Sequence, residues 1–381
     1  MIALNDEERA LQQSVRGHLE REVAPLVAEH EQSRTFPVKI LPALHEFGYV
    51  RGILPEADGG DGMSHAMLAV LMEEAGRCWG SLRTTLNICT VVPLVLSSVA
   101  TPEQKQRWLT PLLSGERRGW FAMTEAGAGS DAAALRTTAT REGDEYVLHG
   151  SKLYITNATY GDLGVVLAST DRSAGARGIS AFMVDGRESH YEVAEIPHMP
   201  VRATSSCEVV FDGTRVPAAN LLGEPGRGLS AAMAAINIGR LNMAMGAVGL
   251  AQCALEHSIE FARSREQFGR PIGGFQLVQE MIVEIATLTQ TSRLLGVHAA
   301  RTLDAGLPAR LECSMAKLHC GEAGSRAATL ALQVHGGAGL MEESTVERLF
   351  RDAREATIPE GTSQIQILSI GRELLGLSAM R

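Results

Sequence analysis

The stretch Ile358-Pro359-Glu360-Gly361-Thr362-Ser363-Gln364-Ile365-Gln366 places a single carboxylate where strand-like sequence gives way to a helix. Apolar residues recur at helical spacing from Ile367 onward, which predicts a helix capped by Thr362 or the residue after it. Gly361 has no Cβ, so a ligand carbonyl can approach the backbone N–H groups beside it closely. Glu360 is therefore a candidate base for removing a proton next to a carbonyl, although a carboxylate before a helix also simply favours the helix dipole.

The overall composition is that of an ordinary globular protein with more than one domain. The 381 residues are many for a single hydrophobic core, so two or three domains are expected. Hydrophobic residues make up 45% and charged residues 21%, proportions that argue against a disordered chain. The 44 acidic residues outnumber the 35 basic ones and give a net charge of −9, which disfavours a nucleic-acid partner.

Neither the cysteines nor the hydrophobic segments suggest a metal site, a disulfide framework or a membrane anchor. The cysteines form no C-x-x-C pair, which argues for reduced thiols at Cys78, Cys89, Cys207, Cys253, Cys313 and Cys320. No segment approaches the roughly 18 uninterrupted apolar residues needed to cross a bilayer. The first residues are acidic and helical in character, unlike a signal or transit peptide, so we expect a cytoplasmic protein without a membrane partner.

The hydrophobic period changes twice along the chain. Asn5 and Glu8 form a capping-box pattern at the start of a helix that Pro25 is expected to end, and helix-like segments continue to about residue 115. Short β-type runs separated by glycine, aspartate and asparagine follow over residues 120–222, and long amphipathic stretches come after them. The expected domains are helical over residues 1–118, β over 119–224 and helical over 225–381.

Several motifs, in order along the chain, resemble those of the acyl-CoA dehydrogenases, flavoenzymes that desaturate acyl thioesters between Cα and Cβ. The segment around Glu360, preceded by Phe350-Arg351-Asp352-Ala353-Arg354, is similar to the C-terminal signature of that family. Pro55-Glu56-Ala57-Asp58-Gly59-Gly60-Asp61-Gly62 is similar to the family's Pro-Glu-x-x-Gly-Gly-x-Gly turn. The resemblance implies an α+β fold with an N-terminal helical domain, a middle β-barrel or sandwich domain and a C-terminal four-helix bundle.

A glycine-rich loop at residues 122–131 is a candidate flavin site. Its N–H groups and the hydroxyls of Thr124 and Ser130 suit a pyrophosphate or the polar edge of a flavin, although such a loop is also typical of a plain turn. The loop closely resembles the family's Thr-Glu-Pro-Gly-Ala-Gly-Ser-Asp, with Ala126 in place of proline. The resemblance implies that FAD contacts Phe121, Met123, Thr124, Gly129 and Ser130.

Other segments resemble the remaining FAD contacts of the family. Tyr154 and Thr156 match its Lys-x-Trp-Ile-Thr-Asn motif, which implies a flavin contact where a half-buried strand aromatic is the ordinary alternative. Residues 263–272 resemble Arg-x-x-Phe-Gly-x-x-Ile; in the family this loop and a Gln-x-x-Gly-Gly segment hold the adenine diphosphate end across a subunit boundary. A homodimer or homotetramer is therefore expected, although Arg265 alone is also typical of a solvated surface charge. The implied contacts are Arg265, Phe268, Gln276, Gln333, Gly336, Gly337, Thr362 and Gln364.

The substrate contacts implied by the resemblance are Arg83, Asn87, Ser130, Arg240 and Gly361. Arg83 and Asn87 stand at i, i+4 on a helix that lines the acyl end of the family's pocket, and this helix resembles that of glutaryl-CoA and acyl-carrier-protein dehydrogenases. A distal carboxylate or polar group is one expectation for Arg83, and a surface salt bridge is the other. Some family branches carry their base at the position of Gly239, so Glu360 has no competing carboxylate there.

The motifs together imply an FAD-dependent dehydrogenase of an acyl-CoA. Glu360, with its pKa raised in an apolar pocket, would remove the α-proton while the β-hydrogen leaves as hydride to flavin N5. An acceptor resembling electron-transfer flavoprotein would then reoxidise the enzyme. The alternatives are a dehydrogenase of acyl groups on an acyl carrier protein, such as a polyketide extender unit, a flavin monooxygenase or oxidase of the same fold, and a non-catalytic thioester-binding module.

Overall fold

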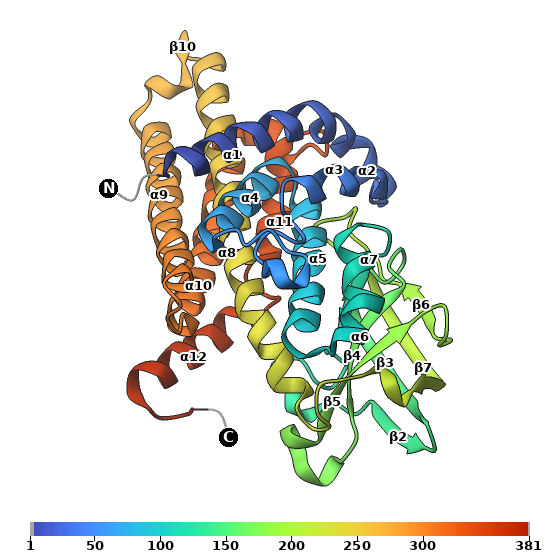
Figure 1. Ribbon diagram of the computed structural model, residues 1–381. Coiled ribbons are helices and arrows are strands. Elements are labelled where there is room, and N and C mark those ends of the chain that lie inside the picture. The colour runs from blue at the N-terminus through green and yellow to red at the C-terminus, as the bar shows by residue number, and fades with distance from the viewer. Residues whose placement is uncertain (1–3, 380–381) are drawn as a thin grey trace.

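The computed structural model describes residues 4–379, which form two helical regions and a β-sheet (Figure 1). The sheet lies at one end of the molecule, beside the long helix α5 (Gly80–Val99). The longest helix, α8 (Gly228–Ser264), crosses the molecule and packs against α4 (His65–Cys78), α5, α9 (Gln276–Asp304) and α10 (Arg310–His335). The order of helices, strands and helices agrees with the expected α+β architecture.

Helices from α1 to α7 build the N-terminal region. Asn5 caps the first one as expected, because its side chain accepts from the N–H of Glu8 at 2.8 Å and the Glu8 carboxylate accepts from the N–H of Asn5 at 3.0 Å. The chain does not leave helical conformation at Pro25, contrary to the prediction; a π-helical turn and a 3-10 turn carry it into the next helix. The remaining helices are α1 (Asp6–His18), α2 (Val27–Ser33), α3 (Leu41–Glu46), α6 (Pro102–Gln104) and α7 (Thr110–Leu113).

The β region is one eight-stranded sheet with the strand order β6-β7-β3-β2-β4-β5-β8 and with β1 paired to β4. All residues of β4 and β5 are buried, which explains why their sequences read as continuous apolar runs and not as alternation. The strands are β1 (Gly119–Ala122), β2 (Thr138–Glu142), β3 (Glu145–Thr156), β4 (Leu163–Ser169), β5 (Ile179–Asp185), β6 (Glu192–Glu195), β7 (Ser206–Pro217) and β8 (Leu221–Leu222).

The C-terminal region is a bundle in which α8, α9, α10 and α12 (Ser363–Leu375) pack with the shorter α11 (Thr345–Glu355). A two-stranded hairpin, β9 (Glu266–Gln267) and β10 (Arg270–Pro271), joins α8 to α9. The hairpin and the sheet lie at opposite ends of the molecule (Figure 1).

Helices α4 and α8 touch through their backbones. A Cβ at Gly249 would lie 1.8 Å from the carbonyl oxygen of Glu73, and a Cβ at Gly76 would lie 2.1 Å from that of Gly246. No side chain larger than hydrogen fits at either position, so the two glycines allow a close approach that holds α8 against the N-terminal region.

Helix α5 is long and apolar enough to span a membrane by length and composition alone, although polar residues interrupt its apolar run. However, 72% of its apolar window is buried inside the protein. It also carries Arg83 and Asn87 into the molecule, where both are buried. Helix α5 is therefore placed as a core helix of this fold.

Candidate active site

The loop that carries Glu360 joins two helices. Helix α11 ends at Glu355, so a helix and a turn precede Glu360, and the predicted strand-like segment is wrong. Thr362 caps α12 as expected, because its hydroxyl accepts from the N–H of Ile365 at 3.3 Å. Within the loop, Glu360 has φ of 57° and Gly361 has φ of 89°. A left-handed residue other than glycine is strained, so its surroundings must hold Glu360 in this conformation.

Three side chains from three helices hold the two carbonyl groups of this turn. Gln366 on α12 donates to the carbonyl oxygens of Glu360 at 3.0 Å and Gly361 at 2.9 Å. Arg240 on α8 donates through Nε to the Glu360 carbonyl at 3.3 Å, and Lys317 on α10 donates to the Gly361 carbonyl at 2.7 Å. The left-handed turn is therefore fixed by tertiary hydrogen bonds, which stabilise a conformation that the loop would otherwise avoid.

The Glu360 carboxylate reaches back between α5 and α8. Asn87 on α5 donates through Nδ2 to Glu360 Oε1 at 2.8 Å, and Asn242 on α8 donates to Asn87 Oδ1 at 3.1 Å. A Cβ at Gly239 would lie 2.8 Å from the carboxyl carbon of Glu360 and 2.9 and 3.0 Å from its two oxygens. The carboxylate of Glu360 thus occupies the space that a side chain at Gly239 would fill.

The surroundings of Glu360 favour its action as a base. Burial raises the pKa of the Glu360 carboxyl, and the nearby Glu355 adds to this rise. The Asn87 hydrogen bond and the positive charges of Arg240 and Lys317 oppose it. A carboxyl group whose pKa is raised holds an abstracted proton more readily than an ordinary glutamate, which is the property expected of a general base.

The second expectation for Arg83, a surface salt bridge, is wrong, because the residue is 1% exposed. Its guanidinium pairs with Glu355 at 2.6 Å, and Thr84 donates to both oxygens of the same carboxylate at 3.0 and 2.9 Å. This polar cluster lies one helical turn along α5 from Asn87. A substrate carboxylate would therefore meet an arginine that already has a counter-ion. Asn87, which was predicted to contact the substrate, donates a hydrogen bond to the carboxylate of Glu360.

The predicted flavin loop forms an open ledge. Glu125 anchors this loop. Its carboxylate pairs with Lys152 at 2.8 Å and accepts from the N–H of Thr137 at 2.9 Å. A Cβ at Gly129 would meet no atom within 4 Å. Among residues 4–379, no acceptor receives the N–H groups of Thr124, Gly129 and Ser130. Unused donors on an open ledge fit the polar edge and phosphates of FAD.

This ledge adjoins the Glu360 site. Tyr154, at the edge of the ledge, has φ of 60° and is 64% exposed, so it is not the half-buried strand aromatic of the alternative interpretation. Thr156 ends β3, and the next residue, Asn157, donates to the carbonyl of Thr85 on α5 at 3.3 Å. The end of β3 thus contacts α5, the helix that also carries Asn87, the hydrogen-bond partner of Glu360.

The residues predicted for the adenine end lie elsewhere. Arg265 and Phe268 lie at the end of α8 and in the hairpin after it, and Gln276 begins α9. Gln333 lies in the last turn of α10, and Gly336 and Gly337 lie in the 3-10 turn that follows. Stacking of Phe261 on His335 at 4.3 Å brings the end of α8 and the end of α10 together. Arg265 lies 26 residues beyond Gly239 on the same helix, roughly 39 Å at 1.5 Å per residue. Within one chain, the residues predicted for the adenine end therefore lie far from Gly239 and the Glu360 carboxylate.

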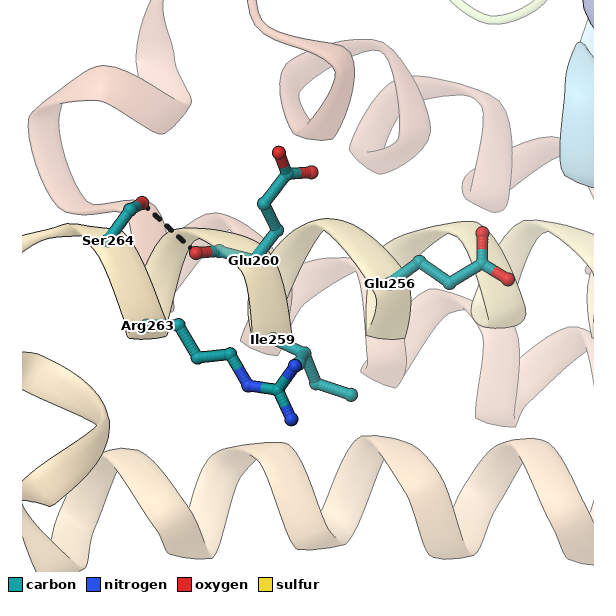
Figure 2. A pocket seen from close by; sticks show the side chains of 5 residues that line it. All are labelled: Glu256, Ile259, Glu260, Arg263 and Ser264. Atoms are coloured by element: carbon teal, nitrogen blue, oxygen red, sulfur yellow. Dashed lines mark hydrogen bonds between the residues drawn. The ribbon is translucent and has the colours of Figure 1, made fainter.

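A hollow lies along the last turns of α8, where Phe261 stacks on His335 at the end of α10 (Figure 2). It is lined by Glu256, Ile259, Glu260, Arg263 and Ser264, and the carbonyl of Glu260 accepts from the Ser264 hydroxyl at 3.0 Å. Arg263 points away from the carboxylate of Glu260 in this view. The hollow contains none of the predicted site residues.

The sequence did not predict a role for three residues around the active-site loop: Asn242, Lys317 and Glu355. Gln366 stood in the quoted motif without a role. A charged residue between apolar neighbours in Met315-Ala316-Lys317-Leu318 is the only signal that could have indicated a buried cation. The sequence carries no signal for the pairing of Glu355 with Arg83, because the two lie far apart in the chain.

Comparisons with known proteins agree with the fold and the site. Models of the acyl-CoA dehydrogenase N-terminal, middle and C-terminal domains match residues 5–116, 120–214 and 226–375. The "Caffeyl-CoA reductase-Etf complex subunit CarC" of Acetobacterium woodii is 38% identical, over 97% of this chain and 99% of its own. Butyryl-CoA dehydrogenase from Megasphaera elsdenii superposes with a TM-score of 0.94 at 31% identity, over 98% of this chain and 100% of that one.

A further solved structure, "Prolyl Acyl Carrier Protein Oxidase AnaB", gives a TM-score of 0.92 at 30% identity, over 98% of this chain and 100% of that chain. The match of three domain models in order, with relatives above 30% identity over nearly the full length, establishes the family. The chain belongs to the acyl-CoA dehydrogenase family, and it is an oxidoreductase that uses FAD.

Proposed function

We propose that this enzyme dehydrogenates an acyl-CoA between Cα and Cβ, and that Glu360 removes the α-proton. FAD, when bound, supplies the acceptor for the β-hydrogen. The observation that supports this proposal most is the carboxylate of Glu360, wedged between Asn87 and Gly239 with a raised pKa and held on a clamped turn. The N–H of Glu360 donates to no group among residues 4–379, so it is free to bind the thioester carbonyl as negative charge develops there.

The test is Glu360→Gln, which keeps the shape of the side chain and removes its basicity. We expect the variant to retain FAD and to bind acyl-CoA, while anaerobic flavin reduction in a stopped-flow instrument slows at least about a thousandfold. Glu343→Gln, on the exposed surface, is the control and should reduce flavin at the normal rate. Rapid flavin bleaching by Glu360→Gln would rule out this residue as the base.

For the acyl group, we propose a substrate with a polar or carboxylate end that approaches the cluster of Arg83, Thr84 and Glu355. A polar group can share the hydrogen bonds of this cluster, whereas a fatty acyl end would meet a polar surface where an apolar one would suit it. Arg83→Ala is expected to weaken substrates with a distal polar group more than butyryl-CoA. Equal loss for both classes would contradict the proposal.

An acyl carrier protein is the second candidate for the thioester carrier. The likeness to a structure named as an acyl carrier protein oxidase favours it. Titration of the yellow protein under anaerobic conditions with acyl-CoAs and with the matching acyl carrier proteins distinguishes the two carriers. Bleaching by only one class would identify the carrier. If neither class bleached the flavin, fast oxygen consumption by the chemically reduced protein would support a monooxygenase or oxidase instead.

We also propose that the active enzyme is a homo-oligomer and that an electron-transfer flavoprotein reoxidises it. The roughly 39 Å between Gly239 and Arg265 separates the predicted adenine end from the proposed base within one chain, which supports a second copy as the source of the adenine end. The name of the Acetobacterium woodii relative, a subunit of a reductase-Etf complex, supports the acceptor. We place the enzyme in the cytoplasm on the character of its sequence alone.

A further inference from the structure

Lys317 is an unusual buried cation. It is 1% exposed, and among residues 4–379 no carboxylate lies within 4 Å of its Nζ. Lys152, the other fully buried lysine, has the expected arrangement, with Glu125 at 2.8 Å. Burying an ammonium group away from water without a contacting counter-ion is costly, so a lysine in this situation calls for an explanation.

The single hydrogen bond of Lys317 points to that explanation. Nζ donates at 2.7 Å to the carbonyl of Gly361, the residue directly after Glu360. Gly361 and Glu360 are both left-handed, and the peptide that joins them carries the carbonyl of Glu360, which Arg240 and Gln366 hold. Lys317 comes from α10, and among residues 4–379 it is the one residue of that helix that bonds either carbonyl, so it ties the turn to α10.

We propose that Lys317 is a positioning residue for the reaction: by holding the Gly361 carbonyl, it keeps the Glu360 carboxylate and N–H directed into the site. This inference rests on the proposed function of Glu360. The charge of Lys317 has a second effect, because it lies close enough to Glu360 to oppose the rise in the pKa of that carboxyl.

The charged groups around Lys317 set the expected pH dependence. They are Arg240 on α8, Glu322 on the same helix, Glu355 at the end of α11, and Glu360. Burial and the positive charge of Arg240 lower the pKa of Lys317 to about 8, against the opposing effect of the three glutamates. Above that pH the ammonium loses its charge and becomes a weaker donor, so the hold on Gly361 should weaken as pH rises.

The test compares Lys317→Met with wild type. Methionine keeps the length and apolar stem of the side chain and removes the ammonium. We expect FAD content and the dissociation constant of acyl-CoA to change less than about threefold, while the rate constant of flavin reduction falls by roughly 10- to 100-fold, as for a group misplaced by up to about 1 Å. Lys105→Met, which removes a half-buried lysine paired with Asp58 at 2.8 Å, is the matched control.

The pH profile separates positioning from a general loss of stability. Since a neighbouring cation lowers the pKa of a carboxyl, its removal should move the ascending limb of the flavin-reduction profile to higher pH. We also expect the rate of flavin reduction by wild type to fall above about pH 8, and this fall should be absent in Lys317→Met. An unchanged profile and rate in this variant, with Glu360→Gln inactive, would overturn the positioning role alone. An active Glu360→Gln would overturn the proposed function as well.

Discussion

The position of the Glu360 carboxylate depends on the absence of a side chain at Gly239. A Cβ there would lie 2.8 Å from the carboxyl carbon of Glu360, whereas carbon atoms in contact prefer about 3.5–4.0 Å. In Gly239→Ala the carboxylate would therefore have to retreat by about 0.7 Å or more. Glutamate is flexible enough to move, so we expect the protein to fold with its base displaced.

The size of the effect follows from this displacement. A misplacement of about 1 Å in a reacting group costs up to about 100-fold in rate, so a retreat of about 0.7 Å should slow flavin reduction by roughly 10- to 100-fold. Folding stability should not fall, because alanine is favoured over glycine inside a helix by up to about 1 kcal/mol. The variant should thus lose rate without losing stability.

Anaerobic stopped-flow flavin reduction at saturating acyl-CoA measures the rate, and urea unfolding measures the stability. Gly371→Ala on α12 is the control, because a Cβ at this helical glycine would meet no atom within 4 Å. It should reduce flavin at the wild-type rate. A Gly239→Ala variant that also reduces flavin at the wild-type rate would refute the argument that this glycine sets the position of the base.

Three further substitutions test the surroundings of the base. Asn87→Leu removes a hydrogen bond that lowers the pKa of Glu360, so the ascending limb of flavin reduction should shift to higher pH; an unshifted limb would contradict this. Arg83→Met should cost about 3–5 kcal/mol in urea unfolding because it strands Glu355, and adding Glu355→Leu should restore most of that loss; additive losses would show that the two are uncoupled. Thr362→Ala should destabilise the protein by about 1 kcal/mol through the lost cap, and no change in urea unfolding would count against the capping role.

The features that the sequence predicted well are those that neighbouring residues determine. The cap formed by Asn5 and Glu8 depends on residues three positions apart, and it is confirmed. The apolar runs of β4 and β5 also follow from local sequence. The prediction that Pro25 ends the helix was wrong because Pro25 lies in the first turn of the next helical segment. A backbone N–H is not needed for helical hydrogen bonding at that position.

The features that the sequence did not predict come from distant segments. Glu360 could be named from its motif, but the partners that define its chemistry, Asn87, Asn242 and Lys317, come from three other helices. Arg83 was expected either in the pocket or on the surface, and the structure pairs it with Glu355, a residue on another helix. No periodicity links positions so far apart, because such contacts arise from the packing of whole helices.

The backbone contact between α4 and α8 has a consequence for attempts to change acyl preference. Gly76 and Gly249 leave no side chain between the two helices that could be enlarged or trimmed, so α8 acts as a fixed wall of the site. The opposite wall, α5, meets the site through side chains such as Thr84 and Asn87. Engineering a new substrate range should therefore begin with side chains on α5, which can be exchanged without moving the helix that positions the base.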